Sequence, residues 1–174
     1  VRVHDTVDNL GFERTPHMFL YHLNLGWPFV DEGSELVAPI RRQLWASDST
    51  TEQNVPHTPM PAPIKGFVEQ VWEHELQVGS DDTHRVALIR PDRELGIEVS
   101  WDARTMPNFF EWQNMREGQY GLGLEPSSNH VAGEQHADRA VRNLRMFDQI
   151  GGRFHDRGHA RFVVGPQQRR AVGG

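Results

Sequence analysis

Two short segments of this chain carry side chains that could move protons. Tyr21–Pro28 contains His22, and Gly121–Asn129 contains Glu125. Each segment has the composition of a β-strand with one acid/base residue near its end. An imidazole and a carboxyl group that face one another can take a proton from a hydroxyl group while giving a proton to an oxygen. Paired transfer of this kind opens and closes a sugar ring, so His22 and Glu125 are the candidate catalytic residues. Their side chains should then converge on one cavity, with a gap the size of a sugar between them.

The alternation around His22 indicates which side chains accompany it. In an extended strand, Met18, Leu20, His22 and Asn24 lie on one side of the backbone. Two apolar residues followed by His and Asn are typical of a strand that leaves the core and enters a polar pocket. Asn24 is therefore a candidate substrate-binding residue. A half-buried histidine bonded to a backbone carbonyl is the alternative explanation of the same pattern.

Glu125 follows a stretch of nearly bare backbone. Gly121 and Gly123 share its face of the predicted strand. Glycine weakens a strand interior and often marks a close approach by a ligand or another backbone. A bulge at a sheet edge, with Glu125 in solvent, is the alternative. The segment is not a dinucleotide fingerprint, because Pro126 occupies the third glycine position and no helix is predicted after it.

Further candidates carry weaker signals. His74 shares the face of Trp72 and Leu76, which favours a core position, with a place in the pocket as the alternative. Trp112 could stack on a sugar, although aromatic residues of β-proteins usually belong to the core.

A metal-dependent isomerase or lyase is a further hypothesis for the chain. Its ligands would come from His17, His22, His74 and Glu125. Alternation argues against it, since His17 and His22 fall on opposite faces of a strand. We therefore expect neither a metal nor another cofactor in the reaction.

Composition excludes several classes of protein. The 174 residues carry a net charge of −6, whereas nucleic-acid binders usually present a basic patch. No apolar run approaches the roughly 20 residues of a membrane span, so we expect no membrane partner. The lack of cysteine excludes disulfides and thiol nucleophiles and suits a cytoplasmic protein.

Period-two alternation dominates the chain and predicts an all-β fold. Leu95, Ile97, Val99 and Trp101 share one strand face, and in 68–78 the residues Glu69, Glu73 and Glu75 lie opposite Trp72 and His74. The other predicted strands cover residues 1–8, 17–25, 84–90, 108–115, 119–126 and 160–165. Residues 48–63 are predicted to form a long loop. Short turns between strands favour one antiparallel sandwich or barrel over βαβ units, with residues 1–174 as a single β-domain.

Four ordered motifs resemble the aldose 1-epimerase (galactose mutarotase) family, and most closely its poorly characterised aldose-epimerase-like branch. They are Tyr21–Pro28, Glu69–His74, Pro107–Trp112 and Gly123–Pro126. The resemblance covers nearly the whole chain and implies a galactose-mutarotase-like supersandwich. It also implies that the chain is the C-terminal half of that domain, because the family takes a second histidine and an arginine from an N-terminal half not seen here.

The resemblance also implies roles for individual residues. Glu125 would be the general base for the anomeric hydroxyl, and His22 the general acid for the ring oxygen. Mutarotases carry an Asp-His pair where this chain has Glu73 and His74, so Glu73 is expected to bind a sugar hydroxyl. Together with Asn24 and Trp112, these residues are the predicted substrate contacts.

We expect the partner of this chain to be a small sugar or sugar derivative, and two functions would involve such a partner. The first is a mutarotase, and the second is a non-catalytic carbohydrate-binding β-module that uses the same residues as hydrogen-bonding groups. Apolar sheet surface left uncovered by a missing half would favour homo-oligomers.

Overall fold

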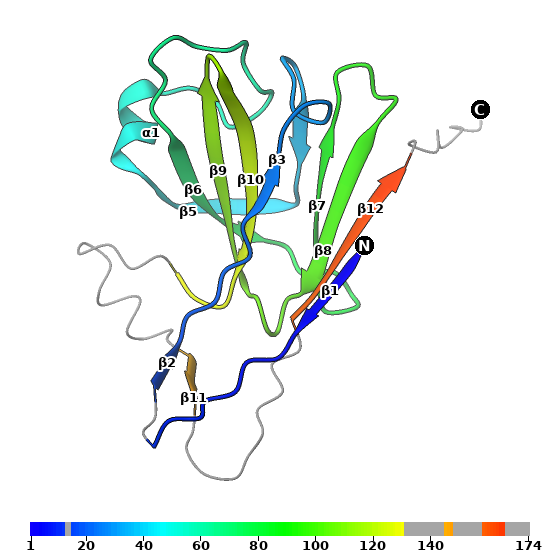
Figure 1. Cartoon of the computed structure of the whole chain (residues 1–174). Coiled ribbons are helices and arrows are strands. Elements are labelled where there is room, and N and C mark those ends of the chain that lie inside the picture. Colours follow the sequence, from blue (N-terminus) through cyan, green and yellow to red (C-terminus); the bar gives the residue numbers. More distant parts are fainter. Residues whose placement is uncertain (13–14, 131–144, 148–157, 166–174) are drawn as a thin grey trace.

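The computed structural model describes residues 1–12, 15–130, 145–147 and 158–165 (Figure 1). They form two five-stranded antiparallel sheets and one two-stranded ribbon. The first sheet contains, in spatial order, β1 (Arg2–Asp5), β12 (Gly158–Gly165), β8 (Gly96–Asp102), β7 (Thr83–Ile89) and β4 (Glu35–Val37). The second contains β3 (Leu23–Leu25), β10 (Gln119–Ser127), β9 (Asn108–Arg116), β6 (Gln70–Leu76) and β5 (Ile40–Ala46). The ribbon pairs β2 (Thr15–His17) with β11 (Arg145–Phe147). The predicted all-β antiparallel sandwich is confirmed.

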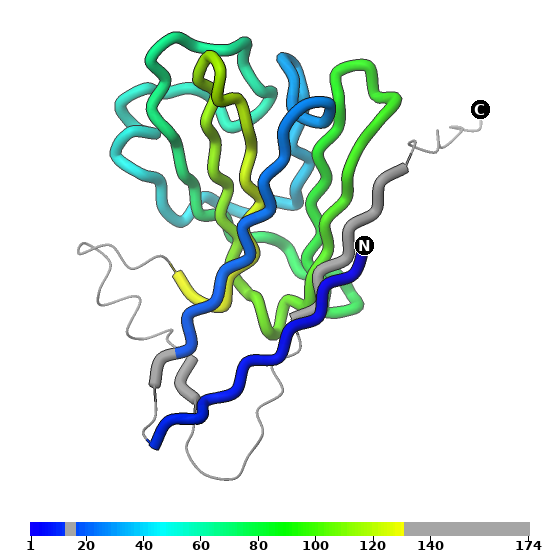
Figure 2. Tube along the Cα trace, in the orientation of Figure 1, coloured from blue at the N-terminus to red at the C-terminus, as the bar shows by residue number. Residues whose placement is uncertain are grey.

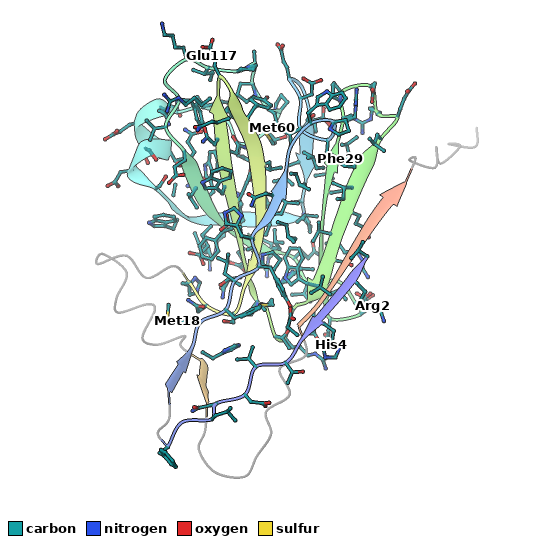
Figure 3. All side chains as sticks on the ribbon, in the orientation of Figure 1. Arg2, His4, Met18, Phe29, Met60 and Glu117 are labelled. Carbon is teal, nitrogen blue, oxygen red and sulfur yellow. The ribbon has the colours of Figure 1, made fainter. Side chains whose placement is uncertain are left out.

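Alternation places one face of each sheet in a shared apolar core. The first sheet contributes Val86, Leu88, Ile97, Val99 and Trp101, and the second contributes Leu76, Phe109, Met115, Leu122 and Leu124. Loop residues complete the core, among them Met60, which lies between the sheets (Figure 3). The predicted inward face of the strand at 95–101 is confirmed for Ile97, Val99 and Trp101. On the second sheet, the face turned away from this core carries Gly121, Gly123 and Glu125.

The N-terminal segment connects the two sheets. Figure 2 traces it from β1, which pairs with β12 in the first sheet, to β3, which pairs with β10 in the second. The predicted strand over 17–25 is interrupted: β2 ends at His17, Leu20 forms an isolated bridge with Ser127, and β3 begins at Leu23.

The side chains of this segment point to other faces than predicted. Met18 and Leu20 are exposed, whereas Phe19, Tyr21 and Leu23 pack against the core. The apolar pair at 18 and 20 therefore does not enter the core, because pairing with β10 turns the odd-numbered side chains inward.

Four elements were not predicted from the sequence. Residues 48–63 contain the short helix α1 (Asp48–Gln53), which begins after Ser47 and ends at Asn54 in the left-handed conformation. Helix α1 is fixed to β6 through Val71, whose backbone N–H donates to Ser47 Oγ and Thr50 Oγ1. Strands β4, β5 and β11 are the other three. Among the described residues, no helix has the length and apolar character needed to cross a membrane.

Candidate active site

Strand register places His22 directly opposite Glu125. Leu23 pairs with Leu124, and Leu20 forms its bridge with Ser127, so the antiparallel count sets residue 22 against residue 125. Cross-strand partners in such pairs have Cβ atoms about 4.5–5.5 Å apart and point to the same face. Two residues separated by 103 positions in the chain are thus brought together by backbone pairing alone.

The two side chains are in direct contact. His22 Nε2 lies 2.9 Å from Glu125 Oε1, and the side chains are 42% and 8% exposed. The sequence predicted that both groups face one pocket, and they do share the outer face of the second sheet. It also predicted a gap the size of a sugar between them, and no such gap separates these two atoms. A substrate would bind over the exposed edge of His22 or separate the pair.

The glycine next to this pair makes the contact possible. A Cβ atom on Gly123 would lie 2.9 Å from His22 Cε1, 3.0 Å from Glu125 Oε1 and 3.1 Å from Trp112 Cβ. These distances are shorter than ordinary van der Waals contacts, so only glycine fits here without movement. The side chains of His22, Glu125 and Trp112 therefore approach the Gly123 backbone closely, where the sequence predicted an approach by a ligand or another backbone.

Trp112 forms the wall beside His22. Strand β9 pairs Trp112 with Gly123, and the indole meets the His22 ring edge-on with centroids 5.6 Å apart. Its Nε1–H donates to Glu69 Oε2 at 2.9 Å, which fixes the indole. Glu69 adds a second carboxylate to the same face of the sheet.

The environment of Glu125 makes it a good proton carrier near neutral pH. Burial, and secondly the negative charge of Glu69, raises the pKa of Glu125 to about 7. A carboxyl group with such a pKa is effective in general acid/base catalysis at neutral pH, because it both accepts and releases a proton there. An exposed carboxylate at a sheet edge, the alternative interpretation, would not be buried in this way.

The predicted substrate contacts are divided between two faces. Asn24 pairs with Gly123 and is exposed. Glu73 lies two strands from Glu125, and both pair with Phe110. The Glu73 carboxylate contacts His130 Nδ1. Asn24, Glu73 and Trp112 therefore share the side of the sheet that carries His22 and Glu125.

His74 lies outside this candidate site. As alternation along β6 requires, it occupies the core face opposite to Glu73, where it is 3% exposed and its Nε2 lies 3.0 Å from Glu111 Oε2. The core interpretation of His74 is confirmed, and a direct contact with a molecule bound beside His22 would require it to cross the sheet. His17 stacks on Phe19 and is buried, so it is also separate from His22.

Sequence reasoning missed the role of Glu69 at this site. Its place opposite Trp72 in the alternating strand was a usable signal, because it put Glu69 on the face of Glu73. A cavity of about 270 Å³ lies elsewhere, on the first sheet beside Asp81, Arg85 and Asp102, and none of the predicted site residues lines it.

Two solved structures share this fold. The chain matches a candidate aldose 1-epimerase from Klebsiella pneumoniae subsp. pneumoniae MGH 78578 with a TM-score of 0.78 and 19% identity, over 94% of this chain and 42% of that one. It matches the Slr1438 protein from Synechocystis sp. PCC 6803 with a TM-score of 0.63 and 22% identity, over 95% of this chain and 50% of that one. The chain therefore has an aldose-epimerase-like β-sandwich fold and spans half or less of each structure that it matches.

A family model defines the relationship at the level of sequence. The model of a domain of unknown function, DUF4432, matches residues 1–149, and the chain belongs to this family. No curated protein sequence matches the chain.

Proposed function

We propose that this chain carries the acid/base pair of a sugar mutarotase of the aldose 1-epimerase type. The observation that carries the proposal is the direct His22–Glu125 contact, on the outer face of the second sheet, with a carboxyl pKa of about 7. The fold and the order of the four sequence motifs support it.

The proposed reaction needs one proton transfer at each residue. Glu125 takes the proton from the anomeric hydroxyl, the bond between the anomeric carbon and the ring oxygen breaks, and its electron pair goes to the ring oxygen. His22 gives a proton to that oxygen. The products are an open-chain aldehyde and a residue pair in which Glu125 has gained one proton and His22 has lost one. Rotation of the aldehyde and the reverse steps give the other anomer, with no net change in atoms or electrons.

Neighbouring groups would orient the sugar. Trp112 offers an aromatic ring held by Glu69, and aromatic faces suit the apolar faces of sugars. Asn24 and Glu73 offer hydrogen-bonding groups on the same face, and we propose them as contacts to sugar hydroxyls.

A carbohydrate-binding module is the second candidate function. The observation in its favour is the 2.9 Å separation of His22 and Glu125, which closes the space that a reacting ring would occupy between them. Such a module would bind sugars without altering the rate of anomer exchange.

The pH dependence of anomer exchange tests the assigned base. Glu125 must be deprotonated to act, so kcat/KM should fall below a pH of about 7, in proportion to the fraction of carboxylate in the free protein. Polarimetry over a pH series gives this profile. A rate that stays constant from pH 5 to pH 8 would rule out Glu125 as the base.

Glu69→Gln should move that profile in a defined direction. The charge of Glu69 raises the pKa of Glu125, so its removal lowers this pKa and shifts the acid limb to lower pH. The glutamine oxygen can still accept the Trp112 N–H. Glu117→Gln is the matched control, because Glu117 lies at the far end of the β9–β10 hairpin (Figure 3). An equal shift in both variants would contradict the local charge effect.

Gly123→Ala should impair catalysis far more than Gly121→Ala. The new methyl group at 123 must displace the His22 ring or the Glu125 carboxyl, and misplacement by about 1 Å can cost ~100-fold in rate. At position 121 the nearest atoms to a Cβ are at 3.4 and 3.9 Å, which are ordinary contacts. Rates of anomer exchange and thermal unfolding are measured for both variants. Equal rates in the two folded variants would show that the geometry at Gly123 is unimportant.

A further inference from the structure

A second cluster of histidine and carboxylate groups lies on the core side of the second sheet. His57 follows α1 in the chain, His74 lies on β6 and Glu111 on the neighbouring strand β9. His74 and Glu111 are buried, and the side chain of His57, at the edge of the cluster, is 32% exposed. The cluster is separated from His22 and Glu125 by the sheet itself, and the proposed ring opening does not use it.

The ligand atoms of this cluster have the spacing of a metal site. Glu111 Oε2 lies 3.2 Å from His57 Nδ1 and 3.0 Å from His74 Nε2, and the three atoms all lie within 4.8 Å of one another. Ligands about 2.0–2.1 Å from a tetrahedral zinc ion are roughly 3.3 Å from one another. The two measured edges are therefore within a few tenths of an ångström of the spacing around one ion, and the edge between the two histidine nitrogens is at most 4.8 Å.

The surroundings of the cluster also favour a cation. Glu111 is fully buried, and a buried carboxylate must be paired, hydrogen-bonded or bound to a metal. Its other oxygen, Oε1, accepts a hydrogen bond from Gln113 Nε2 at 2.7 Å, which fixes the carboxylate as outer partners fix metal ligands. His57 Nδ1 is shielded from solvent and makes no hydrogen bond of good geometry, so it is available as a ligand.

We propose that His57 Nδ1, His74 Nε2 and Glu111 Oε2 bind a divalent transition-metal ion, with Zn²⁺ as the best fit to two imidazoles and one carboxylate. The partly exposed side of His57 is the entry path and leaves a fourth position for water. The ion would link the segment after α1 to strands β6 and β9. It would thereby stabilise the second sheet on the face opposite to the candidate active site. This inference does not depend on the proposed mutarotase function.

Metal content and spectroscopy test this site in the natural protein. After chelator treatment and dialysis, the protein should take up one Zn²⁺ per chain by equilibrium dialysis with elemental analysis, and its Tm should rise. Co²⁺ in place of Zn²⁺ should give the intense visible absorption of a tetrahedral centre. Failure to bind either ion with a Tm increase would overturn the proposal, whatever the activity of the protein.

Variants assign the ligands. His57→Asn is the main variant, because His57 is partly exposed and outside the strands, and it should weaken Zn²⁺ binding at least ~100-fold, the upper end of the effect seen even for outer partners of metal sites. Glu111→Gln should abolish binding where the variant folds. His22→Gln, from the His22–Glu125 pair on the opposite face of the sheet, is the matched control and should bind Zn²⁺ normally. Normal binding by His57→Asn, or loss of binding only in His22→Gln, would show that the cluster is a hydrogen-bonded core triad.

Discussion

Replacing Glu125 by glutamine is expected to slow anomer exchange by ~100-fold or more in the natural full-length protein, the usual contribution of a positioned acid/base group. Glutamine has nearly the same shape and can still hydrogen-bond His22, which lies 2.9 Å away in the wild type. It cannot accept the proton of the anomeric hydroxyl. The measurement is the polarimetric rate at pH 8, together with the Kd for the sugar, which should change little.

Stability provides the control for this variant. The pKa of Glu125 in the fold, about 7, lies above its ordinary value of 4.5, so the native state binds the proton more tightly than the unfolded chain does. Glu125 therefore lowers the free energy of unfolding as the pH rises from about 4.5 to 7. Glu125→Gln removes this penalty and should unfold at a Tm no lower than that of the wild type at pH 8. A marked loss of Tm would attribute the slower rate to damage of the fold.

His22→Gln is expected to reduce the rate to a similar degree, by ~100-fold or more, because the ring oxygen then leaves without a proton donor. The side chain is 42% exposed, so the substitution should alter stability only slightly. An unchanged rate of anomer exchange in this variant would leave only the binding-module hypothesis.

The double variant shows whether the two residues act as a unit. Groups that act together in one catalytic step are strongly non-additive, so Glu125→Gln combined with His22→Gln should be little slower than either single variant. Separate contributions that multiply in the double variant would indicate independent roles, such as two contacts to different sugar hydroxyls.

Local alternation predicted a large part of the candidate site. It placed Gly121, Gly123 and Glu125 on one face, and it set Glu73 opposite to His74 on β6, as the structure has them. These features depend only on the period of two along a strand. The assignment of His74 as a sugar contact followed from the family resemblance, whereas alternation placed His74 on the core face, where the structure has it.

The remaining features depend on pairing between distant segments. The contact of His22 with Glu125 follows from the register of β3 on β10, which cannot be read from either strand alone. That register also turned Met18 and Leu20 outward, contrary to the prediction. His57 was not predicted as a site residue because α1 and the segment after it have no apolar periodicity. Only tertiary packing brings His57 to Glu111.

Anomer exchange by the wild-type protein is the direct test of the proposed mutarotase function. Freshly dissolved α-anomers of common aldoses are mixed with the natural full-length protein at pH 8, and the decay of optical rotation is compared with the spontaneous rate. If His22 and Glu125 act as proposed, the decay of at least one sugar accelerates in proportion to protein concentration and returns nearly to the spontaneous rate with Glu125→Gln. Binding of these sugars with no acceleration of any of them would contradict the proposal.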